Sequence, residues 1–569
     1  MKAAQAGRRS GEQRVGLDPW AAEPPPALTL PALLRHAAGQ HGDREAIVDG
    51  ALRLSHGELH ARARTVARAL LAAGVHKGTR VAVLMGNRAE WVASAFGAAM
   101  TGAVLIPVNT FSPAEEREYV LRHSDAAVLL MQRSLLRHDW LDELLDAHPG
   151  LRGAQPGAIA DPGLPRLRAV VCLDTDESIG AVQTWAQFLD AATRIDDALL
   201  DAVIDDVQPE DDAVVIYTSG TSARPKGVLH VQRSGAMQSF RWAAQQRLDV
   251  DDRIWTTMPF FWSAGFTKGL GASLAAGSCM VVQQWFDPAA VLEAIERERI
   301  TTVICRRHQE AALAAHPDAV RRDLRSLRRA HEASPLRAFA GDDWDDWDRG
   351  GAYGLTEAFT LVTSCPADTP LELRRGTNGR PFPGTVVRIV DPQSGEPLPA
   401  GTEGEIAIGG TTLMRGYYKR PREETLDAAG LFHTGDGGWI DDAGWLHWQG
   451  RRTGMIKTAG ANVSPVEIEQ ELARWGRLRL AVALGVPDAV RDEAVVVCAM
   501  QRTDHPVSAD EVRDYLRERL APYKVPRDVL FFEEGDVEFT GSDKVRPESV
   551  RAFTLARLGA HGSDMESTS

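Results

Sequence analysis

The segment from Tyr217 to Val228 constrains this chain more than any other stretch. It reads Tyr-Thr-Ser-Gly-Thr-Ser-Ala-Arg-Pro-Lys-Gly-Val and directly follows the apolar residues 214–216. An apolar run that passes into such a polar segment is typical of a buried strand followed by a loop. Hydroxyls, backbone N–H groups and the cation of Lys226 can together hold a polyphosphate, because they stabilise oxyanions. Pro225 stands where a Walker A loop needs its second glycine, so that pattern is excluded. A surface turn rich in serine and threonine is the alternative for this segment alone.

Apolar segments that are predicted as strands alternate with segments that are predicted as helices. Residues 80–85 are predicted to form a buried strand, 88–101 a helix and 103–108 another strand. A strand–helix–strand order favours a parallel sheet. Residues 288–299 and 301–305 repeat this alternation as a helix and a strand. The sequence therefore predicts an α/β fold with βαβ layers.

The pattern changes towards the C-terminus. Residues 386–409 carry two β-rich runs around a Gly- and Pro-rich turn, which predicts a β-hairpin. Helices at 465–475 and 508–520 and strands at 480–486 and 494–500 predict a small α+β domain. Because 569 residues exceed the capacity of one core, several domains are expected. We expect a loose N-terminal arm (1–26), a large domain with a β-rich subdomain (27–451), a small mobile domain (452–558) and a polar tail (559–569).

Composition narrows the class of protein. A net charge of −14 argues against nonspecific binding of nucleic acids. Five scattered cysteines without a CxxC pair indicate neither zinc nor a disulfide framework, and they fit a reducing cytoplasm. No apolar segment follows the N-terminal arginines, so no signal peptide is expected. The uncharged stretch 91–108 is interrupted by Gly97, Gly102 and Pro107, which predicts a buried helix and strand and no transmembrane segment.

Further motifs follow the loop in one order. Any one of these motifs is weak evidence, but the ordered set is strong evidence. They are Ala352-Tyr-Gly-Leu-Thr-Glu357, Asn378-Gly-Arg-Pro-Phe-Pro-Gly384, Gly404-Glu-Ile406, Met414-Arg-Gly-Tyr-Tyr418, Phe432-His-Thr-Gly-Asp436, Gly450-Arg451 and Ile456-Lys-Thr-Ala-Gly-Ala-Asn-Val-Ser-Pro-Val-Glu-Ile-Glu469. Together they resemble the AMP-forming acyl-CoA synthetases of the adenylate-forming superfamily. The resemblance covers residues 30–555.

The resemblance implies a site for ATP and Mg²⁺. Tyr353 is similar to the aromatic residue that stacks on adenine, with core packing as the alternative. Asp436 resembles the carboxylate that binds ribose, although aspartates in such turns often only cap the turn. Thr356 and Glu357 resemble a catalytic pair that contacts phosphate and Mg²⁺, which prefers oxygen ligands; a solvated surface glutamate is the alternative for Glu357. The metal-ligand candidates are Glu357 and Thr218. The residues implied to bind ATP or AMP are Thr218, Ser219, Gly220, Thr221, Ser222, Lys226, Tyr353, Gly354, Thr356, Asp436, Arg451 and Lys544.

The resemblance also implies a catalytic lysine and a CoA site in the small domain. Lys544 resembles the lysine that bridges the attacking carboxylate and the α-phosphate, although Asp543 replaces a usual glycine and a plain surface lysine is the alternative. Lys457 and Gly460 resemble the CoA contacts, Gly460 being similar to the glycine of the pantetheine tunnel; a simple turn before the next helix is the alternative. The hinge position is occupied by Thr453.

The acyl pocket is implied to lie near an aromatic motif, in which the candidates are Phe261, Trp262, Ser263, Gly265 and Phe266. Core packing explains these side chains equally well. An apolar acid is favoured, because no cation is placed to bind a second carboxylate unless Lys268 turns inward. The acidic, tryptophan-rich segment 342–348 either lies outside the nucleotide site or alters substrate range or activity.

We therefore expect an enzyme, an ATP- and Mg²⁺-dependent ligase that joins a carboxylic acid to CoA through an acyl-adenylate. A fatty, alicyclic or aromatic acid is expected, and the partners are the acid, ATP and CoA. One alternative is an acyl-AMP ligase that loads a separate carrier protein. The other is a degenerate nucleotide-binding homologue, for which Glu332, Thr453 and Asp543 are the support.

Overall fold

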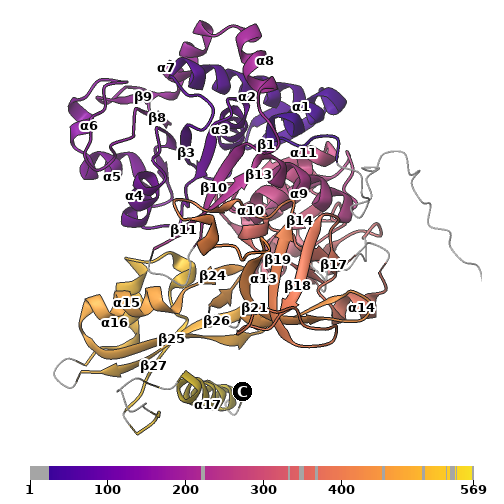
Figure 1. Cartoon of the computed structure of the whole chain (residues 1–569), viewed down its shortest axis with the longest axis vertical. Coiled ribbons are helices and arrows are strands. Elements are labelled where there is room, and N and C mark those ends of the chain that lie inside the picture. Colours follow the sequence, from indigo (N-terminus) through magenta and orange to yellow (C-terminus); the bar gives the residue numbers. More distant parts are fainter. Residues whose placement is uncertain are drawn as a thin grey trace, which may run out of the picture. The chain divides into compact units, whose positions relative to one another are not determined.

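The computed structural model describes residues 25–566 apart from 219–223, 331–333, 345–350, 366–368, 452–454, 503–505, 534, 539–544 and 546 (Figure 1). The described chain forms two compact units. The larger unit contains the residues up to Thr110 together with Glu118–Tyr217 and Gly227–Gln449. The smaller unit contains Phe111–Arg117, Thr218–Lys226 and the residues from Gly450 onwards.

An eight-stranded sheet lies at the centre of the larger unit, counted over the described residues. The pairs that join its strands from β10 to β9 are parallel. In spatial order the strands are β20 (Gly416–Tyr417), β11 (Lys226–Val231), β10 (Asp212–Thr218), β4 (Val104–Pro107), β3 (Arg80–Leu84), β5 (Val128–Gln132), β8 (Ala169–Leu173) and β9 (Val182–Thr184). Such a sheet agrees with the α/β fold that the sequence predicts.

The predicted strand–helix–strand segment is confirmed as β3, α3 (Ala89–Met100) and β4. β4 is buried along its whole length, as strands of covered parallel sheets are. Gly102 adopts φ +68°, which lets the chain leave α3 and turn directly into β4. Within the described ranges, no helix has the length and apolar character needed to cross a membrane.

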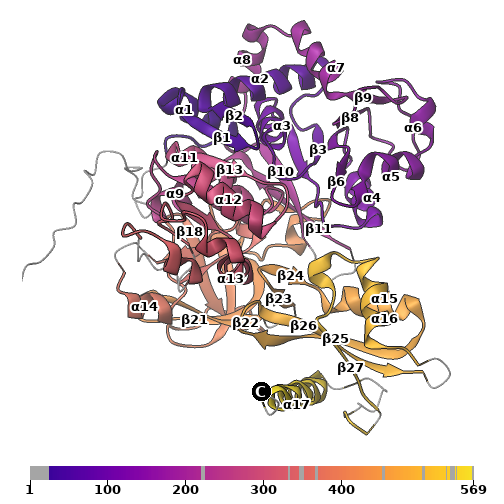
Figure 2. The ribbon, with the colours of Figure 1, turned by 180° about the vertical axis from the view of Figure 1, so that it is seen from behind.

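A second sheet of five strands completes the α/β part of the larger unit, again over the described residues. Its strands are, in order, β14 (Thr302–Ile304), β12 (Arg253–Thr256), β13 (Cys279–Val282), β1 (Glu45–Asp49) and β2 (Leu52–Ser55). The helices that share the largest hydrophobic core with the two sheets include α1 (Leu30–His41), α2 (His56–Ala72), α3, α9 (Gln232–Gln245) and α11 (Ala272–Ala276). α9 and α11 pack against each other, as both views show (Figures 1 and 2).

The predicted helix at 288–299 is confirmed as α12 (Pro288–Glu298), and the strand after it is β14. Asp287 caps this helix, because its carboxylate accepts a hydrogen bond from the N–H of Ala290, and Pro288 occupies the first turn.

The remainder of the larger unit is antiparallel. β18 (Thr385–Val390) and β19 (Gly404–Gly410) form the predicted hairpin, and β21 (Phe432–Ile440) and β22 (Leu446–Arg451) extend that sheet. A short three-stranded sheet of described residues contains β15 (Ala352–Tyr353), β16 (Thr363–Ser364) and β17 (Arg380–Pro381). The β-rich subdomain expected from the sequence is therefore present.

The smaller unit is an α+β domain with its own core. Its helices are α15 (Pro465–Trp475), α16 (Ala509–Arg517) and α17 (Pro547–Glu566), and its strands are β23 (Ile456–Thr458), β24 (Ala461–Val463), β25 (Leu478–Asp488), β26 (Asp492–Gln501) and β27 (Asp528–Phe531). α15 and α16 cover one face of the sheet and α17 covers the other (Figures 1 and 2).

Strand β26 serves both cores of the smaller unit. Val495 and Val497 belong to the cluster that contains α15 and α16. Val496 and Cys498 belong to the cluster that contains Val550 of α17. Successive side chains of a strand point to opposite faces, so an uninterrupted apolar strand is what a sheet covered on both sides needs.

Candidate active site

Tyr353 and Asp436 are brought together in the larger unit. The Tyr353 hydroxyl donates a hydrogen bond of 2.5 Å to Oδ2 of Asp436. Both side chains are buried, with 7% and 2% of their surface exposed. The N–H of Asp436 donates to Oγ1 of Thr434, which in turn donates to the Ile406 carbonyl, so the carboxylate is fixed on β21. The residues predicted for adenine and ribose thus lie side by side.

Thr356 and Glu357 lie in a 3₁₀ turn, η5 (Thr356–Ala358), that follows β15. A side chain at Gly354 would collide with the carbonyl oxygen of Thr360, so the tight return of the chain requires glycine there. The Glu357 carboxylate accepts a hydrogen bond of 2.8 Å from Tyr417 of β20. A half-buried carboxylate with hard oxygen atoms is suited to share Mg²⁺ with substrate phosphates.

The sequence reasoning missed two residues that hold this turn, His230 and Tyr417. Nε2 of His230 lies 2.7 Å from the carbonyl oxygen of Thr356. Burial lowers the pKa of His230 to about 4, so the ring is neutral at pH 7 and donates through Nε2. A histidine within the otherwise apolar strand after Lys226 was the available signal for His230, and the Met414–Tyr418 motif was the signal for Tyr417.

The predicted phosphate loop begins and ends in strands. Thr218 is the last residue of β10 and Lys226 is the first residue of β11. A Cβ atom at Gly227 would lie 2.6 Å from Cγ1 of Val215, so the start of β11 requires glycine. Ser219, Gly220, Thr221 and Ser222 lie outside the described residues, and their roles stay predictions.

The aromatic motif predicted for the acyl group is largely buried in the larger unit. Phe266 stacks on Phe96 with ring centroids 6.1 Å apart, and its ring meets Phe359 edge-on at 5.8 Å. Phe261 and Ser263 are buried and Trp262 is half-buried. A side chain at Gly265 would collide with the Pro259 carbonyl oxygen.

Lys268, the cation of the aromatic motif, has its ammonium group 4.6 Å from the ring centroid of Trp242. Such a cation–π contact holds the charge against an aromatic face. The preference for an apolar acid stays a prediction.

In the smaller unit, Lys457 and Gly460 lie in the hairpin of β23 and β24. Ala459 and Gly460 form its two-residue turn with φ values of +47° and +75°. A turn with two positive φ values matches the twist of a hairpin and favours glycine. The backbone N–H of Lys457 donates to Glu493 at 2.7 Å, which fixes the start of the hairpin. Lys544 and Thr453 lie outside the described residues, as does Asp543, and Arg451 ends β22.

Lys524 is another lysine of the smaller unit that could be considered as a catalytic cation, and it is deeply buried. Its side chain is 1% exposed, and Nζ lies 2.7 Å from Glu467 and 3.3 Å from Glu116. Glu116 belongs to the same compact unit. Two carboxylates already neutralise this ammonium group, so a structural role fits Lys524 better than contact with substrate.

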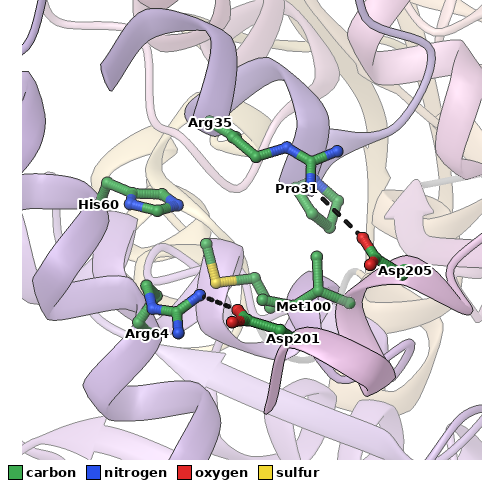
Figure 3. Close-up of a pocket in the computed structure, with 8 residues that line it drawn as sticks. Pro31, Arg35, His60, Arg64, Met100, Asp201 and Asp205 are labelled. Atoms are coloured by element: carbon green, nitrogen blue, oxygen red, sulfur yellow. Dashed lines mark hydrogen bonds and ion pairs between the residues drawn. The ribbon is translucent and has the colours of Figure 1, made fainter. Parts of the chain in front are cut away.

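A cavity of about 320 Å³ lies in the larger unit, and none of the residues that line it is a predicted site residue (Figure 3). It is lined by residues of α1, α2, α3 and α8 (Asp197–Asp205). Arg35 pairs with Asp205 at 3.4 Å and Arg64 with Asp201 at 2.6 Å (Figure 3). Burial, with the nearby Arg64 and Arg35, lowers the pKa of His60. Because both guanidinium groups are matched by carboxylates, we assign no substrate to this cavity.

Comparison with known proteins decides the family. The model of the family described as AMP-binding enzyme matches residues 34–418, and the model of the AMP-binding enzyme C-terminal domain matches residues 467–544. The chain belongs to the AMP-binding enzyme family. Within that family it is an enzyme of the acyl-CoA ligase type, as the resemblance implied.

Several relatives match nearly the whole chain. It is 32% identical over 515 residues to the feruloyl-CoA synthase of an Amycolatopsis species, covering 89% of this chain and 95% of that protein. It is 32% identical over 513 residues to the 3-(7a-methyl-1,5-dioxo-octahydro-1H-inden-4-yl)propanoyl:CoA ligase of Mycobacterium tuberculosis, with the same coverage. The structure of the amide bond synthetase McbA from Marinactinospora thermotolerans is similar with a TM-score of 0.73 and 26% identity, over 92% of this chain and 99% of that one.

Proposed function

We propose that this acyl-CoA ligase activates an apolar carboxylic acid, fatty, alicyclic or aromatic, with ATP and Mg²⁺ and then transfers the acyl group to CoA. The observation that carries the proposal is the clustering of Tyr353, Asp436, Thr356 and Glu357. Tyr353 is bonded to Asp436, and η5 follows Tyr353 within a few residues. One relative is named for an aromatic acid and another for an alicyclic acid. Both acids belong to the class proposed for this enzyme.

In the first step a carboxylate oxygen attacks the α-phosphorus of ATP, and the bond from that phosphorus to the leaving pyrophosphate breaks. Asp436 orients the ribose by accepting hydrogen bonds from its hydroxyls, with Tyr353 fixing the carboxylate. Lys226 and Lys544 supply positive charge to the phosphoryl oxygens, where charge accumulates. Mg²⁺ supplies further positive charge when bound, and Glu357, with Thr218, is proposed to hold it.

In the second step the CoA thiol loses its proton to solvent, its sulfur attacks the acyl carbon, and the bond from that carbon to the AMP oxygen breaks, which releases AMP. Gly460 is proposed to border the path of the pantetheine arm. The hairpin turn at Ala459 and Gly460 carries only small side chains, as a path for a thin chain beside the backbone requires. The nucleophile that accepts the acyl group, here CoA, distinguishes CoA ligases from relatives that use another nucleophile.

A panel of carboxylic acids tests the proposal. Pyrophosphate release is measured with each acid, with and without CoA, and the acyl product is identified by mass spectrometry. Release that depends on an apolar acid, together with an acyl-CoA product, is the expected result. Acyl-AMP could instead persist in the presence of CoA and react with a carrier-protein thiol or an amine. That result would show that the thiol or the amine, and not CoA, is the acceptor. No release with any acid would favour the degenerate homologue.

A further inference from the structure

The turn that carries Thr356 and Glu357 is strained immediately after those residues. Phe359 has φ +51° and Thr360 has φ +87°, and neither is a glycine. A positive φ is uncommon for residues other than glycine, and for a β-branched residue such as Thr360 it is a true outlier that stores backbone strain. Strain of this kind persists only where the surrounding structure over-determines the backbone.

A buried glutamine provides the restraint. Nε2 of Gln238, on α9, donates to the carbonyl oxygen of Ala358 at 2.8 Å and to that of Leu361 at 2.7 Å. These two carbonyls flank the strained pair. Gln238 has no exposed surface, so the two hydrogen bonds are shielded from water. One amide group therefore clamps both ends of the strained segment.

The orientation of that amide is itself fixed. Nη1 of Arg241 donates to Oε1 of Gln238 at 3.3 Å. Arg241 is anchored in turn by a hydrogen bond of 2.5 Å to the Pro383 carbonyl and by the Phe382 ring, 5.3 Å from its guanidinium carbon. Because a guanidinium group can only donate, the oxygen of Gln238 must face Arg241 and its NH₂ group must face the turn.

The start of the same turn is also held by hydrogen bonds, one of them from β11, the strand that precedes α9. His230 donates to the Thr356 carbonyl, as described above. The Glu357 carbonyl accepts from the N–H of Met414 at 2.7 Å. The backbone on both sides of the Glu357 side chain is thus tied to elements distant in sequence.

We propose that Gln238 is a positioning residue for Thr356 and Glu357, holding the strained turn so that the Glu357 carboxylate keeps one geometry toward Mg²⁺ and phosphate. The inference rests on the proposed function only in assigning Mg²⁺ to Glu357. Its action is indirect, through the Ala358 and Leu361 carbonyls, and it predicts a defect in Mg²⁺ use beyond any loss of stability.

The test compares two glutamines of the same helix. Gln238→Met removes the amide at similar side-chain length. Gln245→Met is the matched control, because Gln245 is also buried on α9 but donates to Ser364 of β16 and not to the Ala358 and Leu361 carbonyls. Loss of a residue that orients a metal ligand typically costs 10- to 100-fold, so Gln238→Met should raise the half-maximal Mg²⁺ concentration for pyrophosphate release by about 10- to 100-fold. Gln245→Met should leave it within about threefold, with a comparable loss of Tm.

A second readout needs no turnover. The Tm of each protein is measured with ATP at rising Mg²⁺ and no acid. If the wild type is stabilised by ATP in an Mg²⁺-dependent way yet releases no pyrophosphate with any acid, the ligase proposal fails, and the shift of this Mg²⁺ curve still decides the role of Gln238. ATP stabilisation of the wild type without Mg²⁺ dependence would overturn the inference.

Gln238→Asn covers the case in which Gln238→Met does not fold. Asparagine keeps the amide but is one methylene shorter, so it should give a smaller shift in the same direction. An unchanged Mg²⁺ curve in whichever variant folds, or an equal shift in Gln245→Met, would overturn the inference.

Discussion

The Tyr417 hydroxyl donates to the Glu357 carboxylate across 2.8 Å, although 60 positions separate the two residues. Tyr417 owes its place to β20, which pairs with β11 so that Tyr417 lies opposite Val228. The edge of the eight-stranded sheet thus reaches the predicted metal ligand through one side chain. The Tyr417 hydroxyl occupies one oxygen of the Glu357 carboxylate, and this hydrogen bond orients the carboxylate for a cation.

Tyr417→Phe should therefore raise the Mg²⁺ requirement of pyrophosphate release by about 10-fold, since loss of a partner that orients a metal ligand has effects of that size. The measurement is an Mg²⁺ titration at saturating ATP. Tyr418→Phe is the matched control, because that hydroxyl meets the Ser124 carbonyl at 3.4 Å instead. Equal titrations for both variants would remove Tyr417 from the site.

Glu357→Gln should weaken the Mg²⁺ dependence of pyrophosphate release more than Tyr417→Phe, because it removes the charged ligand itself. Stability should change little, since the carboxylate is not part of the hydrophobic core. The exposed Glu424→Gln serves as the control. A wild-type Mg²⁺ titration for Glu357→Gln would exclude Glu357 as the Mg²⁺ ligand.

Lys544→Ala should reduce adenylation by about two to three orders of magnitude, the usual cost of one electrostatic contact to a transition state. Thioester formation from supplied acyl-AMP should be nearly intact, because this lysine is needed only in the first step. The two half-reactions are measured separately on one preparation. Full adenylation by the variant would exclude Lys544 as the catalytic lysine.

Lys524→Met should act on stability. Removing one partner of a buried ion pair costs about 3–5 kcal/mol, because the carboxylates of Glu467 and Glu116 lose their counter-charge. Arg477→Met, which breaks the exposed pair with Glu511 in the same unit, should cost less than about 1 kcal/mol. Urea denaturation measures both. Retained stability together with abolished adenylation would instead make Lys524 a catalytic candidate.

Gly460→Asn should spare acyl-AMP formation and impair reaction with CoA. Asparagine tolerates the positive φ of +75°, so its side chain enters the space beside the turn with little backbone strain. Gly476→Asn, at φ +68° after α15, is the matched control and should leave both half-reactions unchanged. If Gly460→Asn reacts normally with CoA, the thiol enters by another route.

The sequence predicts elements whose signal is local. The uncharged run through α3 and β4 and the uninterrupted apolar residues of β26 determine their own burial, and Asp287 with Pro288 marks the start of α12. The motif residues Tyr353 and Asp436 were predicted by resemblance. Their direct hydrogen bond was not, because 83 positions separate them.

The remaining parts of the site depend on contacts that no local pattern encodes. Gln238 meets a carbonyl 120 positions away, and His230 meets one 126 positions away. In a sequence, a glutamine on a helix indicates a solvated face, so its burial was unpredictable. The positive φ values of Phe359 and Thr360 were equally hidden, since neither residue type favours them.

The two-sided burial of β26 has a practical consequence for recombinant work. A chain truncated before Pro547 would lose α17 and leave the face formed by Ala494, Val496, Cys498 and Met500 without its helical cover. Such an apolar sheet surface promotes self-association. The isolated small domain should therefore be expressed with its last helix attached, even for studies that concern only the hairpin at Gly460.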